Sequence, residues 1–213
     1  MVVGVLRQYQ KYLKVLEGES DEIFTSQKMI EIFCDVELKY VMKMRWSDVQ
    51  DIVKTLSVMF DENSKFTKKF TLKTINYGFI PNLDEITFGE FVDLDACLQD
   101  WQQMHKAMAV LYRPVDIQVR GKYNIKPYEG KMDETLKEMP LSIALGAVFF
   151  LLNLGKELSQ VMMDYLQKGI LKEDSHLKEG LQRNGVGIHH FTKQLKGMLG
   201  DLKISQNLDY TRS

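Results

Sequence analysis

Cysteine is scarce in this sequence, and its two copies form no recognisable motif. Cys34 and Cys97 are the only cysteines in 213 residues, and no CxxC pair is present. A disulfide framework needs several cysteines, and zinc sites of the finger type need closely paired ones. The sequence therefore predicts free thiols in a reduced, cytosolic setting.

An excess of either charge is also missing. Lysine and arginine total 28 against 29 aspartate and glutamate, which gives a formal net charge of −1. This balance provides no overall field that would draw in nucleic acid or an acidic membrane. A local basic patch is compatible with it, so contact with DNA is expected only where lysines gather on one face.

No apolar run is long enough to cross a bilayer. The strongest run, residues 141–154 (LSIALGAVFFLLNL), is shorter than the roughly 20 apolar residues that a spanning helix requires. The first residues lack both a long apolar region and a small-residue cleavage site of the secretory type. Residues 141–154 therefore predict a buried core helix, and no membrane partner is expected.

Sequence motifs of common enzymes are absent as well. There is no GxSxG, Walker-type glycine loop, dinucleotide fingerprint, HExxH or EF-hand pattern. His189 and His190 are adjacent, but neighbouring side chains usually diverge and no third ligand follows at a suitable spacing. Neither a cofactor nor a metal is expected, and these histidines are interpreted as loop or interface residues.

What the sequence does contain indicates one globular domain over residues 1–213. It is 45% hydrophobic and 27% charged, and apolar residues recur at spacings of three and four, which is typical of amphipathic helices. Helices are predicted over residues 9–16, over 27–40 with Ser26 as the cap, from Ser47 to residue 60, and over 140–168. Gly146 and Gly155 in the last of these are expected to mark close helix contacts.

Two segments change to the alternating pattern of strands. Residues 65–74 alternate and are followed by a turn signal, Asn76-Tyr77-Gly78, whereas residues 115–128 are divided by Gly121 into arms 116–120 and 122–125. The expected fold is α+β, predominantly α-helical with a small antiparallel β-sheet. Its parts are a helical N-terminal part (1–63), sheet and capped helices (64–130), a long core helix (about 140–168) and a Gly-rich C-terminal part with a tail (169–213).

The acidic stretch after residue 83 is interpreted as a set of helix starts. Thr87 and Glu90 have capping-box spacing, with Ile86 and Phe91 placed as a hydrophobic staple. Asp93 or Asp95 is expected to cap the following helix, which Pro114 ends at about residue 112. The predicted core residues of this region are Phe91, Leu98, Trp101, Met108 and Leu111.

A metal or hydrolytic site built from the same acids is the less favoured alternative. Around a helix, Asp95 and Asp100 differ by roughly 140°, so they cannot share a ligand with His105 without help from elsewhere.

Lysines interleaved with Phe66 and Phe70 allow a nucleic-acid face, although an edge strand protected by lysines is preferred. The candidate interface residues are Lys65, Lys68, Lys69, Lys73, Phe79 and Arg113.

Several short motifs resemble structural virion proteins of crAss-like and related Bacteroidetes tailed bacteriophages. They are YGFIP (77–81), TFGEF (87–91), MAVLYRP (108–114) and YNIKPY (123–128). The resemblance covers about residues 65–170. It implies a ring or adaptor subunit of the neck and tail that forms a cyclic homo-oligomer around the DNA exit channel. Such a subunit is expected in the host cytoplasm before assembly and in the virion afterwards.

Such a subunit would contact the portal or other tail ring proteins and lie near DNA without reading its sequence. The residues leave two further hypotheses open. One is a cytosolic helical interaction or regulatory protein that is never packaged in the virion. The other is a metal-dependent hydrolase that uses the acidic stretch.

Overall fold

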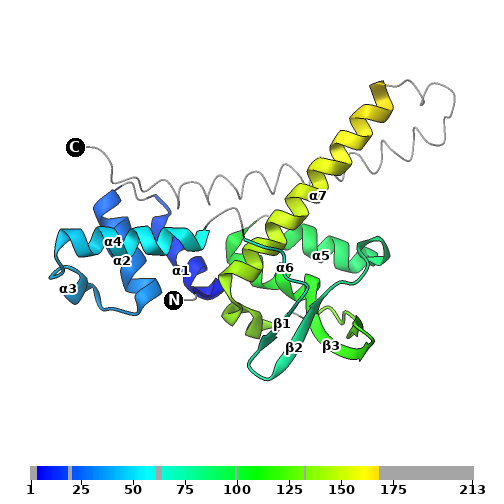
Figure 1. Cartoon of the computed structure of the whole chain (residues 1–213), viewed down its shortest axis with the longest axis horizontal. Helices are drawn as coiled ribbons and strands as arrows, with labels where there is room; N and C mark the ends of the chain where they lie inside the picture. Colours follow the sequence, from blue (N-terminus) through cyan, green and yellow to red (C-terminus); the bar gives the residue numbers. More distant parts are fainter. Residues whose placement is uncertain (1–3, 19–20, 61–63, 99, 132, 168–213) are drawn as a thin grey trace.

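The computed structural model describes residues 4–18, 21–60, 64–98, 100–131 and 133–167. These residues form seven α-helices and a four-stranded antiparallel sheet of order β1-β2-β3-β4, which confirms the α+β, mainly helical class (Figure 1). Buried side chains from the first helix to the last form one continuous core. The predicted Gly-rich part and tail, 169–213, lie outside the described residues.

The N-terminal part consists of four helices, α1 (Leu6–Leu16), α2 (Glu22–Cys34), α3 (Leu38–Val41) and α4 (Trp46–Ser57), followed by a short 3-10 helix, η1 (Val58–Phe60). Aromatic rings hold this part together. The Tyr12 ring lies 5.8 Å from that of Phe33, which lies 5.6 Å from that of Phe60. The α1 helix is confirmed, and it joins the N-terminal helices to the rest of the molecule.

Helix α2 begins five residues earlier than the sequence suggested. Asp21 is its cap, because one of its carboxylate oxygens accepts from the backbone N–H of Ile23 at 2.9 Å. Ser26 lies inside the helix, where its hydroxyl donates to the carbonyl of Glu22. The helix stops at Asp35, whose φ of 54° is left-handed, so the single helix predicted over 27–40 is two helices.

The sheet contains β1 (Lys69–Leu72), β2 (Ile75–Phe79), β3 (Tyr112–Val119) and β4 (Lys122–Ile125). The predicted β3–β4 hairpin around Gly121 is confirmed. The turn predicted at residues 76–78 is wrong: the chain reverses at Lys73, where φ is 55°, and Tyr77 and Phe79 continue as buried strand residues paired with β3. Pairing with a strand far along the sequence therefore overrode the local turn signal.

The β3–β4 hairpin folds back over the outer face of β2. The Tyr123 hydroxyl donates to the carbonyl of Phe79 at 2.8 Å, and the Tyr123 ring covers Gly78. A Cβ atom at position 78 would lie 2.4 Å from that ring. Glycine is needed here because any side chain would displace the Tyr123 ring from this position.

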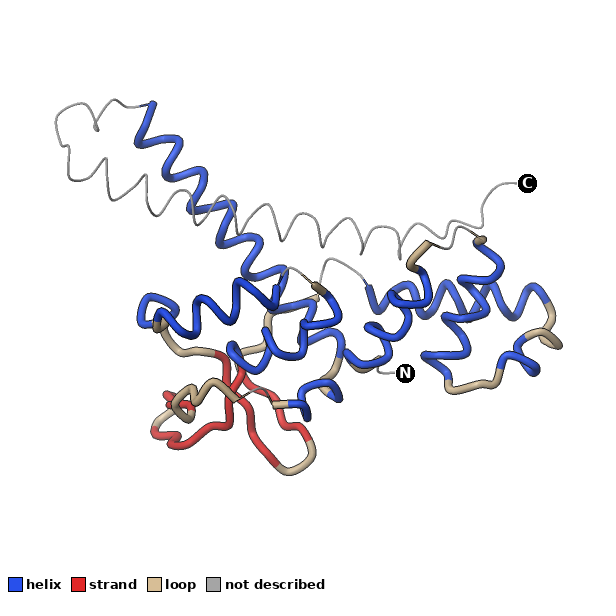
Figure 2. The backbone as a smooth tube through the Cα atoms, turned by 180° about the vertical axis from the view of Figure 1, so that it is seen from behind, coloured by secondary structure: helices blue, strands red, loops and turns tan. Residues whose placement is uncertain are grey.

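Helices α5 (Phe88–Leu98) and α6 (Met104–Leu111) pack beside the sheet, and α7 (Leu141–Gln167) runs across both. Figure 2 shows the strands on one side of the body and these helices on the other. Three short 3-10 helices, η2 (Leu83–Glu85), η3 (Trp101–Gln103) and η4 (Glu134–Glu138), connect them. The first half of α7 is buried, and its second half extends beyond the rest of the described body (Figure 1).

Gly146 allows α7 to touch the segment that leads into β1. A Cβ atom at this position would lie 2.6 Å from the backbone oxygen of Lys65, which is closer than real Cβ contacts come. Gly146 therefore makes a close contact, although with this non-helical segment and not with another helix as predicted, and the contact fixes the distance between α7 and the first hairpin.

Candidate functional site: a basic groove and an apolar helix face

A groove of about 750 Å³ lies between the hairpins, the segment 80–84 and α7. Its floor is aromatic: the Phe66 ring stacks on Phe150 with centroids 4.2 Å apart and meets Phe79 edge-on at 4.8 Å. Six of its residues define what is called below the hairpin groove: Phe66, Lys68, Phe79, Lys122, Tyr123 and Phe150. Such a groove can accept an apolar side chain between two ammonium groups.

The strands around the hairpin groove carry nearly all one sign of charge. Within residues 64–79 and 112–126 the only acidic residue is Asp116. The basic residues there are Lys65, Lys68, Lys69, Lys73, Arg113, Arg120, Lys122 and Lys126. The net charge of the chain is near zero, but its sheet is basic. The four lysines predicted as interface residues are only part of this basic set.

Helix α5 exposes apolar side chains at a helical spacing. Phe88 is 83% exposed, Phe91 42% and Val92 45%. Asp95 lies one turn further along the same stripe, since residues seven apart share a helix face. Exposed apolar clusters on a folded protein often mark a contact with another molecule. This set, Phe88, Phe91, Val92 and Asp95, is called below the α5 face.

The predicted core position of Phe91 is wrong. Leu94, Cys97 and Leu98 face the core from α5, whereas Phe91, at the edge of that stripe, is 42% exposed. Both stripes of this helix are apolar, so periodicity alone could not decide which one is buried. The other predicted core residues, Leu98, Trp101, Met108 and Leu111, are all buried.

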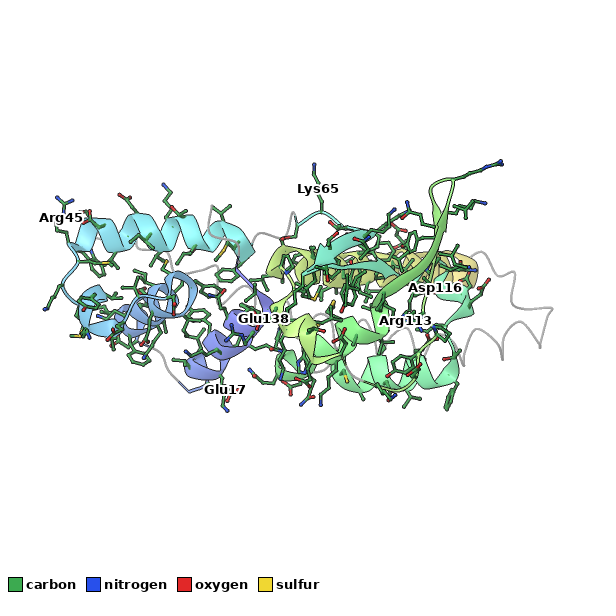
Figure 3. All side chains as sticks on the ribbon, turned by 90° about the horizontal axis from the view of Figure 1, so that it is seen from below. Glu17, Arg45, Lys65, Arg113, Asp116 and Glu138 are labelled. Atoms are coloured by element: carbon green, nitrogen blue, oxygen red, sulfur yellow. The ribbon has the colours of Figure 1, made fainter. Side chains whose placement is uncertain are left out.

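The α5 face and the hairpins belong to opposite sides of the molecule. Figure 3 shows Lys65 and the tip of the β3–β4 hairpin on one side, whereas α5, in pale green, runs along the other. The hairpins therefore carry the basic residues, and α5 presents exposed apolar side chains beside Asp95. The two surfaces are unlike and complementary in character.

A buried ion pair fixes the start of α5 to the start of β3. The Arg113 guanidinium lies 2.6 Å from a Glu90 carboxylate oxygen, and Glu90 is only 4% exposed. The Glu90 carboxylate also accepts from the backbone N–H of Thr87 at 2.7 Å, and the Glu90 N–H donates to the Thr87 hydroxyl at 3.3 Å. Thr87 and Glu90 thus form the capping box that their spacing predicts.

The ionisation of Glu90 follows from these contacts. Burial alone would raise the pKa of this carboxyl, but the hydrogen bonds from Thr87 and the charge of Arg113 outweigh burial and hold the pKa below its usual value. Its oxygens are already occupied by these donors. Glu90 is therefore a structural carboxylate that holds α5 in place.

Asp93 does not cap the next helix, contrary to the sequence prediction. It lies inside α5, and its carboxylate accepts from the Tyr128 hydroxyl at 2.7 Å. Burial and this hydrogen bond both raise the pKa of Tyr128. The cap that follows α5 is Asp100, which accepts from the backbone N–H of Gln102 and starts η3.

These acids also do not gather around one point. Among the described residues, no group of three or more histidine, cysteine, aspartate or glutamate side chains is placed to hold a metal ion. Glu90, Asp93 and Asp100 each bond a different part of the chain. His189 and His190 lie outside the described residues.

Thr87→Ala is expected to lower the free energy of unfolding by about 1 kcal/mol, because the N–H of Glu90 loses its acceptor. Chemical denaturation with a fluorescence readout measures this change. Thr74→Ala is a matched control, since Thr74 is exposed in a turn. A denaturation midpoint identical to that of the wild type would contradict the capping role.

His105 links the N-terminal helices to the rest of the molecule. It is 4% exposed, its Nδ1 lies 3.2 Å from the amide nitrogen of Gln10 on α1, and its Nε2 lies 3.4 Å from a Glu134 oxygen. Gln10 also donates to the Trp101 carbonyl at 2.8 Å. Burial lowers the pKa of His105, and the nearby Glu134 only partly opposes this.

The stability of the protein is therefore expected to fall as the pH drops below about 6.5, the usual histidine value. In that range the unfolded chain gains a proton that folded His105, with its lowered pKa, resists. Denaturation at about pH 7.5 and about pH 5.5, roughly one unit on either side of that value, compares the wild type with His105→Gln. The variant should lose less stability on acidification, and an equal loss in both proteins would contradict the role of His105.

The candidate interface residues separate into two groups. Lys65, Lys68, Lys69 and Lys73 are exposed. Phe79, at the end of β2, has a buried side chain that lines the floor of the hairpin groove. The Arg113 side chain points inward and pairs with Glu90. Both of these were therefore misplaced at an open surface. Phe66 and Phe70 pack against the core, and of these two rings Phe66 lines the hairpin groove together with Lys68.

Sequence reasoning missed the residues that complete both surfaces. The hairpin groove is completed by Lys122, Tyr123 and Phe150, which come from segments far from β1 in the sequence. Among the residues of the two surfaces that were missed, Phe88 and Tyr123 lay in motifs singled out from the sequence, TFGEF and YNIKPY.

No family model, curated protein or solved structure matches the chain. None of the helices in the described ranges is long and apolar enough to cross a membrane.

Proposed function

We propose that this chain is a non-enzymatic structural protein of a tailed-phage virion. In this role it is a ring or adaptor subunit of the head-to-tail connector, in the neck or tail, and it oligomerises around the DNA exit channel. Its neighbours are the portal or other tail ring proteins. It is made in the host cytoplasm and then incorporated into the particle.

One observation carries this proposal: the chain has two unlike surfaces that share no residue, the apolar, partly acidic α5 face and the basic hairpin groove. A surface that complements itself across a two-fold axis favours closed dimers, whereas two unlike complementary surfaces favour head-to-tail contacts. Head-to-tail contacts form rings when the rotation between subunits closes. A connector ring needs this kind of subunit.

The phage-like motifs coincide with these same surfaces. Residues 77–81 include the end of β2, and residues 79–81 line the groove. Residues 87–91 include the start of α5, and residues 123–128 include Tyr123, which also lines the groove. Residues 108–114 supply Arg113, which anchors α5. The motifs therefore support the proposal through positions that build the two surfaces.

The basic hairpins suit proximity to DNA in the channel. Lys69 remains on the outer face of the sheet, with its ammonium 5.4 Å from the Tyr123 ring centroid and 3.3 Å from the Gln118 side-chain oxygen. Lysines of this kind contact phosphates without reading bases. Contact with DNA is part of the proposal, and sequence selectivity is not.

The test is the protein content of purified particles. Denaturing gels and peptide mass spectrometry of particles banded on a density gradient are expected to contain this chain in a fixed ratio to the portal protein. An unpackaged cytosolic interaction protein would use the same surfaces but would be found only in the infected-cell lysate. Absence of the chain from purified particles would defeat the virion role.

A further inference from the structure

We infer that one copy of this chain docks its α5 face into the hairpin groove of the next copy. This inference rests on the proposed function and makes it specific, since it identifies the two surfaces that join neighbouring subunits. The contact is heterologous: each copy offers α5 to one neighbour and its groove to the other.

The shapes of the two surfaces match a known mode of recognition. Amphipathic helices bind grooves through apolar anchors at positions i, i+3, i+4 and i+7. Phe88, Phe91 and Val92 occupy the first three of these positions on α5 and are all exposed. The groove, of about 750 Å³ and with an aromatic floor, provides apolar surface against which these side chains can be buried.

Charge favours the same pairing. Asp95 occupies position i+7 of the α5 face, and Glu85 is exposed just before the helix. The hairpin groove has Lys68 and Lys122 at its rim, with Asp84 as its acidic lining residue. An acid-bordered apolar helix is therefore attracted to the groove, whereas two grooves or two α5 faces would bring like charges together.

The arrangement also determines how copies accumulate. Because the α5 face and the hairpin groove share no residue, a copy that has filled its groove still has a free α5 face. Addition can continue until the last α5 face meets the first groove. A contact of this kind leaves no surface unpaired in a closed ring.

Two variants remove one surface each and leave the other intact. Phe88→Asp disables the α5 face, and Lys122→Glu disables the groove rim. Both side chains are exposed, so both variants should fold like the wild type, as circular dichroism and thermal melting can verify. Each alone is expected to weaken self-association at least about tenfold, measured as mass against concentration in sedimentation equilibrium.

Matched controls make equivalent changes elsewhere. Ile23→Asp alters an apolar side chain that is 53% exposed on α2, and Lys54→Glu reverses an exposed charge on α4. Neither position belongs to the α5 face or the groove. Both controls are expected to associate like the wild type.

Mixing the two disabled variants is the decisive experiment. The Phe88→Asp protein keeps a working groove, and the Lys122→Glu protein keeps a working α5 face, so one productive contact is possible between them. The equimolar mixture should form a species with the mass of two chains and nothing larger. An isologous contact, or an unrelated partner in the groove, would leave the mixture no more associated than either variant alone.

The outcomes separate this inference from the proposed function. Self-association that survives both substitutions, or a mixture that forms no two-chain species, overturns the α5-to-groove contact. If the wild-type chain is nevertheless present in purified particles, the virion role stands with another interface. If two-chain species form but the chain is absent from particles, the contact stands and the virion role falls.

Discussion

Replacing Arg113 with methionine is expected to lower the free energy of unfolding by about 3 to 5 kcal/mol. The substitution keeps most of the side-chain volume but removes the charge that lies 2.6 Å from the buried Glu90 carboxylate. Glu90 is 4% exposed, so water cannot replace the lost partner. Guanidinium denaturation of the two proteins at neutral pH measures the difference.

A second substitution tests whether the cost comes from an unpaired charge. Glu90→Gln keeps a side chain that can complete the capping box with Thr87, and combining it with Arg113→Met removes both charges. The double variant is expected to be more stable than Arg113→Met alone. A double variant that is less stable than Arg113→Met, or a loss below about 1 kcal/mol for Arg113→Met itself, would contradict the buried pair.

Trp101→Ala is expected to cost about 3 to 5 kcal/mol, because it removes a large side chain from the junction between α1 and η3. Trp101 is 5% exposed, and its ring meets Tyr9 edge-on with centroids 5.0 Å apart. The remaining cavity would lie beside the Gln10 amide that holds α1 to the Trp101 carbonyl. Thermal and chemical denaturation measure the loss.

The second tryptophan provides the control for this prediction. Trp46 starts α4 and is 49% exposed, so Trp46→Ala should cost about 1 kcal/mol or less. A Trp101→Ala protein that melts like the wild type would contradict the packing at this junction. Equal losses in the two variants would mean that burial does not distinguish these positions.

The sequence predicted the fold class because local signals and tertiary contacts agree over most elements. Periodic apolar residues identified α1, α4 and α7, and Gly121 identified the β3–β4 hairpin. The predictions failed where a distant partner decides the outcome. Residues 76–78 have the composition of a turn, yet pairing of Tyr77 and Gly78 with β3 places them in a strand. The cap of α2 is Asp21 and not the predicted Ser26.

The candidate site was predictable only in part, for a similar reason. The exposure of Lys65, Lys68, Lys69 and Lys73, in and beside β1, follows from their local pattern. The hairpin groove does not, because Tyr123 and Phe150 reach it only after the second hairpin folds over Gly78 and α7 packs against the segment before β1. Helix α5 has two apolar stripes, and only packing shows that Phe88 and Phe91 are left outside.

The pairing of Glu90 with Arg113 shows the same limit. The capping box was visible in the spacing of Thr87 and Glu90, because all its atoms come from four consecutive residues. The arginine that neutralises Glu90 starts a strand beyond the next helix. No local pattern relates residues so far apart, so Arg113 was interpreted as a surface residue.

The mass of the wild-type chain in solution, measured by light scattering over a wide range of concentrations, tests the central claim most directly. Copies that join α5 to groove should give a mass that rises with concentration above the 24.8 kDa of one chain and levels off when the ring closes. A mass that stays at one chain over the whole range would contradict head-to-tail assembly.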